Sequence, residues 1–293
     1  MIDLKKHFST RLLASAALLV GASTAFAAGA PSLGTVSNFA VLSAAPGGTG
    51  AVTCTNSTIT GDVGSSGLPV SVTQTHCPIT GAIIAPVSTQ VLTDFNGAYN
   101  ALASQSCDSF LTGTLANVTL TPGVYCFAAA ATLTGTLTLN GGSNDTWLFK
   151  VGTSGTGALT GTDFSVVMAG SGQACNVTWW VAQAATMTTS DFKGTILAGS
   201  AITATGVAPT SPFEGRALAK APVTLTNVTF AGCTGGGIGG TAKPKCNQGV
   251  GNGPEGCDPG NSNQSTASPF GPNSNDEVGG VPGNPGRKGG NKK

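Results

Sequence analysis

Short segments in which apolar residues alternate with threonine recur through the middle of the chain. This period of two is typical of β-strands that bury one face. Each segment has an apolar residue, a threonine, usually a small residue, and then a threonine or serine. Five of them align in this way: 133–136 (LTGT), 159–162 (LTGT), 187–190 (MTTS), 202–205 (ITAT) and 223–226 (VTLT). Apolar strands lie between the repeats, and a repeat of about 15 to 30 residues is in the range of a β-solenoid.

The hydroxyl groups of these repeats are expected on one surface. Residues i and i+2 share a face of a strand, so the hydroxyls point outward when the leading apolar residue points into the core. Stacked strands lie about 4.8 Å apart, and i and i+2 about 6.7 Å apart, which gives a regular grid. The sequence predicts that this grid contains Thr134, Thr136, Thr160, Thr162, Thr188, Ser190, Thr203, Thr205, Thr224 and Thr226.

One segment, residues 86–105, has helical rather than strand periodicity. Val91, Phe95, Tyr99 and Leu102 recur at helical spacing and form one apolar stripe. Such a helix needs a surface to cover, and we expect it to lie on the sheets. The fold class predicted is therefore all-β with one long helix.

The two ends of the chain differ from its middle. Residues 1–27 have the basic start, short apolar run and small-residue cleavage site of a secretory signal peptide, so we expect an exported protein. No later stretch reaches the roughly 20 apolar residues of a membrane helix, and no membrane insertion is expected. Residues 28–235 are expected to form one domain. Residues 236–293 are rich in glycine, proline and asparagine, which predicts a flexible tail.

All eight cysteines follow the predicted signal peptide. An even number of cysteines in an exported chain favours disulfides, although the sequence leaves many pairings open. We expect sequential pairing, with the last bond closing a loop in the tail: Cys54–Cys77, Cys107–Cys126, Cys175–Cys233 and Cys246–Cys257. Because no CxxC pair is present, we do not expect a zinc site.

Charged residues are scarce, at 9% of the chain with a net charge of +1, so nucleic acid is not an expected partner. The acidic residues of the domain are scattered singly, and His76 is the only histidine after the signal peptide. Neither paired carboxylates nor a nucleophile with its base is evident, so we expect no enzyme, metal or cofactor.

Two further groups of residues have expected positions. Lys150, Lys193, Arg216 and Lys220 are expected at the surface, as charges that favour solubility or block the edges of sheets. Trp179 and Trp180 are adjacent on a predicted strand, so one ring is expected in the core and the other outside. An exposed tryptophan would be a modest indication of sugar binding.

Several stretches follow one another in a specific order: 37–44 (SNFAVLSA), 59–67 (ITGDVGSSG), 98–103 (AYNALA), 120–127 (LTPGVYCF), 147–151 (WLFKV), 177–198 (VTWWVAQAATMTTSDFKGTILA) and 215–219 (GRALA). With them, the chain resembles the microbial ice-binding proteins over about residues 32–233. The resemblance implies a right-handed, discontinuous β-solenoid of triangular cross-section with a helix packed alongside. It also implies secretion, no enzymatic activity and a sheet face that binds ice. The repeats at Thr134, Thr160 and Thr203 match one version of the family's motif, whereas Thr189 and Leu225 depart from it.

Threonine suits such a surface because its hydroxyl can anchor a water molecule and its β-branched side chain is stiff. We therefore expect a monomeric secreted protein that adsorbs to ice through a flat threonine-rich face and inhibits ice growth or recrystallisation. The alternative is a cell-surface adhesion or matrix protein built on the same solenoid, and the tail favours that alternative.

Overall fold

The structure, a computed structural model, describes residues 31–207 and 210–233. The predicted signal peptide, the predicted tail and the predicted Cys246–Cys257 bond lie outside the described residues. The helical segments are η1 (Gly34–Asn38), η2 (Pro46–Gly48), η3 (Pro69–Ser71), α1 (Thr89–Ala103) and η4 (Ala174–Asn176). The strands are β1 (Phe39–Ser43), β2 (Val52–Thr55), β3 (Thr58–Thr60), β4 (Asp62–Ser65), β5 (Val72–Thr75), β6 (Ile83–Ile84), β7 (Ser109–Phe110), β8 (Val118–Leu120), β9 (Gly123–Phe127), β10 (Ala131–Gly141), β11 (Trp147–Val151), β12 (Leu159–Gly170), β13 (Val177–Val181), β14 (Ala185–Thr188), β15 (Phe192–Ala198), β16 (Ile202–Thr205), β17 (Ser211–Ala219), β18 (Val223–Thr226) and β19 (Val228–Gly232).

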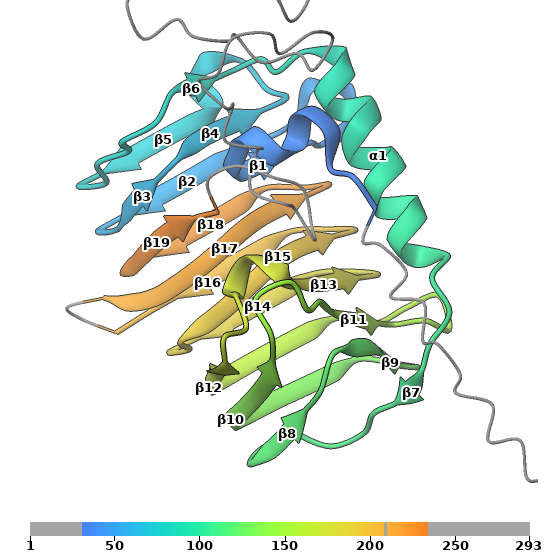
Figure 1. The fold of residues 1–293 in the computed structure, drawn as a ribbon. Coiled ribbons are helices and arrows are strands. Elements are labelled where there is room, and N and C mark those ends of the chain that lie inside the picture. Colours follow the sequence, from blue (N-terminus) through green and yellow to red (C-terminus); the bar gives the residue numbers. More distant parts are fainter. Residues whose placement is uncertain (1–30, 208–209, 234–293) are drawn as a thin grey trace, which may run out of the picture.

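The strands stack in two parallel sheets (Figure 1). Sheet A has the order β6-β4-β1-β17-β15-β13-β11-β9-β7, and β19 joins it by pairing with β17 and β3. Sheet B has the order β5-β2-β18-β16-β14-β12-β10-β8. In both sheets a strand from the N-terminal part of the chain pairs with a strand from its C-terminal part: β1 pairs with β17, and β2 pairs with β18. The order of the strands in space therefore differs from their order in the chain.

A ladder of aromatic rings fills the core between the sheets. Phe149 stacks on Trp179 with ring centroids 4.0 Å apart, and Trp179 contacts Phe192 at 5.4 Å. The ladder continues from Phe192 to Phe213 at 4.9 Å and from there to Phe230 at 4.5 Å. These rings come from strands that neighbour one another in sheet A, so the aromatic contacts continue from strand to strand through the core.

Helix α1 lies along the outer side of sheet A (Figure 1). The predicted stripe is confirmed, since Val91, Phe95, Tyr99 and Leu102 are all buried. They pack in a second hydrophobic cluster with outward residues of the sheet: Leu42, Leu148, Trp180, Leu197 and Leu218. Sheet A is thus apolar on both faces, as the unbroken burial of β1, β11 and β13 indicates.

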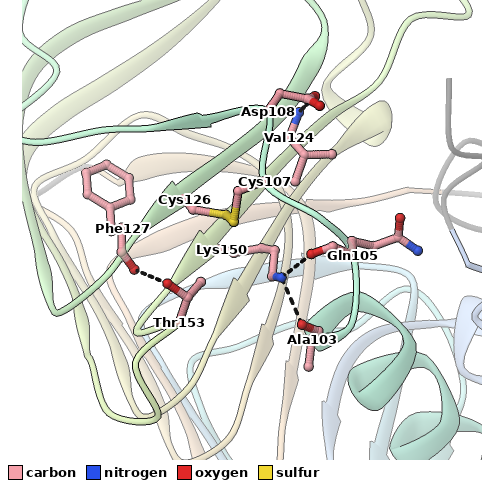
Figure 2. The surroundings of a disulfide bond; sticks show 9 residues. All are labelled: Ala103, Gln105, Cys107, Asp108, Val124, Cys126, Phe127, Lys150 and Thr153. Atoms are coloured by element: carbon pink, nitrogen blue, oxygen red, sulfur yellow. Dashed lines mark hydrogen bonds between the residues drawn. A yellow bond between two sulfur atoms is a disulfide. The ribbon is translucent and has the colours of Figure 1, made fainter. Parts of the chain in front are cut away.

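Three of the predicted disulfides are present: Cys54–Cys77, Cys107–Cys126 and Cys175–Cys233. The Cys107–Cys126 bond joins the segment after α1 to β9 (Figure 2). Nearby, the amine of Lys150 donates hydrogen bonds to the carbonyls of Ala103, at 2.8 Å, and Gln105, at 2.5 Å. These contacts hold the C-terminal end of the helix against the sheet.

The structure confirms a mostly-β fold with one helix and parallel sheets. It corrects the expectation that the four basic residues are surface charges. Lys150 is 4% exposed and Arg216 is 0% exposed. The Arg216 guanidinium donates to the carbonyls of Ser37 and Cys233, so it joins the N- and C-terminal ends of the described chain. Both residues are buried because other segments cover sheet A, which local sequence does not reveal.

Candidate functional site

Sheet B presents threonines in two columns that run across seven strands. Each of these strands contributes a segment of four residues, which we call a rung. The rungs belong to β10, β12, β14, β16, β18, β2 and β5. The first column contains Thr132, Thr160, Thr186, Thr203, Thr224, Thr53 and Thr73, aligned by the strand register. The second contains Thr162, Thr188, Thr205, Thr226, Thr55 and Thr75 in the same register, and Thr134 lies at its β10 end. We call the two columns together the threonine array.

The residues that alternate with the array point into the core, except on the terminal strand β5, where Gln74 is exposed. The leading position of each rung is apolar, and the position between the two threonines is filled in turn by Leu133, Gly161, Met187, Ala204, Leu225, Cys54 and Gln74. Large and small residues alternate through most of this column. A Cβ added at Gly161 would lie 2.8 Å from the sulfur of Met187, so the glycine makes room for its larger neighbour.

The array is accessible and regular. None of its threonines is buried, whereas the residues on either side of them in each rung are mostly buried. Neighbouring strands lie about 4.8 Å apart, so the seven rungs extend over about 29 Å, with about 6.7 Å between the columns. Two lines of hydroxyl and methyl groups, in register from strand to strand, result from this geometry.

The strand register changes the alignment of two of the five predicted repeats. The rung on β10 is 131–134 (ATLT), and the rung on β14 is 185–188 (ATMT), each two residues earlier than predicted. Thr136 therefore lies beyond the register shift in β10, opposite Ser165, and is outside the array. Ser190 is 6% exposed and is also outside it. The remaining predicted residues are in the array: Thr134, Thr160, Thr162, Thr188, Thr203, Thr205, Thr224 and Thr226.

The sequence reasoning missed six members of the array. Thr132 and Thr186 were not predicted because the repeats on β10 and β14 were aligned two residues too late. The other four belong to β2 (VTCT) and β5 (VTQT), which carry the same pattern at 52–55 and 72–75: Thr53, Thr55, Thr73 and Thr75. The alternation could have identified these two strands, but the helix separates them from the other rungs in the sequence.

The chain turns sharply after the second column, in most rungs through a residue with positive φ. These corner residues are His76 (φ 51), Asn56 (φ 48), Asn227 (φ 54), Thr189 (φ 50), Asp163 (φ 49) and Gly135 (φ 68). Asparagine, aspartate and glycine tolerate this conformation well, whereas β-branched Thr189 does not. The Thr189 hydroxyl donates to the carboxylate of Asp163 on the next corner. The corners confine the array to one side of the molecule.

The strand segments that form the array carry no charged side chains. The seven rungs, all of which are described, contain no acidic or basic residue, and Asp163 directly follows one of them. Lys193 forms ion pairs with Asp191 at 3.2 Å and Glu214 at 3.6 Å, on β15, β17 and the corner before β15. A surface of neutral hydroxyl and methyl groups therefore meets solvent beside a neighbouring surface that carries the charges.

The other candidate chemistries find no matching geometry in the described residues. Trp179 and Trp180 are 0% and 7% exposed, because α1 covers the ring that was expected outside. The expectation of one exposed tryptophan is therefore corrected. The indication of sugar binding that depended on an exposed ring is removed as well. No group of three or more histidine, cysteine, aspartate or glutamate residues is placed to hold a metal ion in the described part. None of the described helices is long and apolar enough to span a membrane.

A family model described as ice-binding-like matches residues 32–231. The chain is 33% identical over 221 residues to ice-binding protein K3-B1 of Typhula ishikariensis, covering 67% of this chain and 88% of that protein. It is 37% identical over 185 residues to an ice-binding protein of a Nostoc species, covering 59% of this chain and 64% of that one. A crystal structure of an ice-binding protein from an Antarctic biological consortium matches with a TM-score of 0.60 at 30% identity, covering 69% of this chain and 90% of that one.

Proposed function

This chain belongs to the ice-binding-like family, and from that premise we propose that it adsorbs to ice through the threonine array. The observation that carries the proposal is the register of sheet B, which aligns threonines in two columns with no charged residue among them. The relatives reported above are named for ice binding and give no support to an adhesion or matrix role.

The array suits a solid made of the solvent molecule itself. Each hydroxyl can hold a water molecule, and the adjacent methyl group leaves neighbouring water to bond with itself. β-branching restricts χ1, so the side chains lose little conformational entropy when they meet the crystal. A charged side chain would instead have to give up its own hydration, which is costly. Many weak contacts at regular spacing would therefore add up on a rigid surface.

The proposed fold is a right-handed solenoid of triangular cross-section, formed by residues 28–235. Its support is the way single chain segments pass from sheet B into sheet A at corners that stack on one another, as at β14 and β15. Such a solenoid keeps neighbouring rungs at one spacing. We also infer that the protein is secreted, because of the signal-peptide pattern at residues 1–27, and that it acts as a monomer without a cofactor or catalytic activity.

The test is direct adsorption to ice. The chain without residues 1–27 is labelled with a fluorophore and exposed to a growing ice hemisphere, and thermal hysteresis is measured on the same sample. We expect fluorescent ice planes and a freezing point below the melting point. The same protein held unfolded by reduction of its disulfides is the control. A folded sample that leaves the ice dark and shows no hysteresis would rule the function out.

A further inference from the structure

Two buried serines lie directly behind the second column of the array. Ser190, at the corner after β14, donates from its hydroxyl to the carbonyl of Thr188 at 2.9 Å and accepts the Phe164 amide at 3.3 Å. Ser57, at the corner after β2, donates to the carbonyl of Thr55 at 2.8 Å. It accepts an amide at 3.0 Å from Val228, on the neighbouring segment. The two serines are 6% and 2% exposed.

Each serine joins a rung to the chain segment just past the corner of the neighbouring rung. Thr189 and Asn56 have positive φ, so the chain cannot continue the strand geometry through them. The amides of Phe164 and Val228 then donate to the hydroxyls of Ser190 and Ser57, respectively. A single hydroxyl thus connects the carbonyl of an array threonine to the segment that follows the corner of the neighbouring rung. The two amides belong to Phe164, on β12 just past its rung, and to Val228, the first residue of β19.

We propose that Ser57 and Ser190 are positioning residues for ice adsorption. The inference rests on the proposed function of the threonine array. Groups that bind together must be held within about 0.5 Å of their working positions, and buried hydrogen bonds behind them supply this rigidity. By fixing the carbonyls of Thr55 and Thr188, the two serines fix the direction in which these threonines face the crystal. Neither serine touches ice, because both are buried.

Ser66 offers a matched control elsewhere in the fold. Its hydroxyl donates to the carbonyl of Ala45 at 2.7 Å and accepts the Gly50 amide at 3.0 Å, and it is 7% exposed. The hydrogen bonds and burial are therefore those of the corner serines, but the carbonyl that it holds is not part of a rung. Alanine at any of the three positions leaves a buried amide without its acceptor and should lower stability by a similar amount.

The experiment compares S57A, S190A and S66A in the full chain without residues 1–27. Thermal hysteresis and ice-plane fluorescence are measured near 0 °C, where circular dichroism confirms that each variant is folded. Melting temperature and amide hydrogen exchange are measured in parallel. We expect all three to melt at lower temperature, and the Phe164 and Val228 amides to lose protection in S190A and S57A respectively. Ice adsorption should fall in these two variants and persist in S66A.

Two outcomes would overturn the inference. Equal ice adsorption in S57A, S190A and the unmutated protein would show that the serines do not position the array. A fall that merely follows melting temperature, and is as large in S66A, would show that they act only through stability. If S190A does not fold, S57A against S66A decides the comparison. Absence of ice adsorption in the unmutated protein is a different result, since it removes the proposed function itself.

Discussion

Removal of the Cys54–Cys77 disulfide should weaken ice adsorption more than removal of another disulfide of similar loop length. Cys54 fills the inward position of the β2 rung, between Thr53 and Thr55. Cys77 follows the β5 rung two residues after Thr75. The bond therefore lies behind the array and attaches its terminal rung to the next one.

The expected loss of stability follows from the closed loop. The two cysteines are 23 residues apart, and a loop of this length contributes about 3 kcal/mol by restricting the unfolded chain. For a domain of about 200 residues, this should lower the melting temperature by about 6 to 12 °C. The Cys107–Cys126 bond spans 19 residues, so its removal should cost nearly the same. That bond lies by the end of α1 (Figure 2). Its Cys126 belongs to β9 of sheet A, whereas the array lies on sheet B.

The assay compares C54A/C77A with C107A/C126A. Thermal melts by circular dichroism should show similar destabilisation in both double variants. Thermal hysteresis near 0 °C should fall in C54A/C77A, since the β5 rung is freed, and should be largely retained in C107A/C126A. Equal hysteresis in the two variants, at equal stability, would refute the reasoning that the bond behind β5 keeps Thr73 and Thr75 in the array.

Three further outcomes concern α1. G97A should raise the free energy of unfolding by about 1 kcal/mol in a urea titration, because Gly97 is an exposed helical residue and an added Cβ meets nothing within 4 Å. K150M should lower it by about 1 to 3 kcal/mol, because two carbonyls lose their buried donor, and a K193M control should change it less. Burial raises the pKa of Tyr99 from 10.0 to about 12, so its contribution to stability is complete below pH 10 and is lost as the pH rises toward 12. Urea titrations should show a smaller alkaline loss of stability in Y99F.

The helix and the three described disulfides could be predicted because their signals are local. Val91, Phe95, Tyr99 and Leu102 show helical spacing without reference to any partner. The disulfides close short or moderate loops between successive cysteines, so a sequential guess matched them. Burial by distant segments left no such signal. The sequence around Lys150 does not show that the end of α1 lies over it.

The array was predicted in composition but not fully in register. In 131–136 (ATLTGT), a shift of two residues preserves the alternation of inward and outward residues, so either pair of threonines could form the rung. The same holds for 185–190 (ATMTTS). Only pairing with the adjacent strands selects one alignment, and that pairing is a tertiary property. Ser190 is instead the buried corner residue that bonds to Thr188 and Phe164.

The most direct test of the threonine array compares T203Y with T60Y. Thr203 lies on β16, which has rungs on both sides in sheet B. Thr60 is an exposed threonine on β3, which belongs to sheet A. Tyrosine at position 203 would project beyond the other threonines and hold the array away from a flat crystal. Thermal hysteresis should fall sharply in T203Y and remain at the level of the unmutated protein in T60Y. Unchanged hysteresis in a folded T203Y would place the ice-binding surface elsewhere.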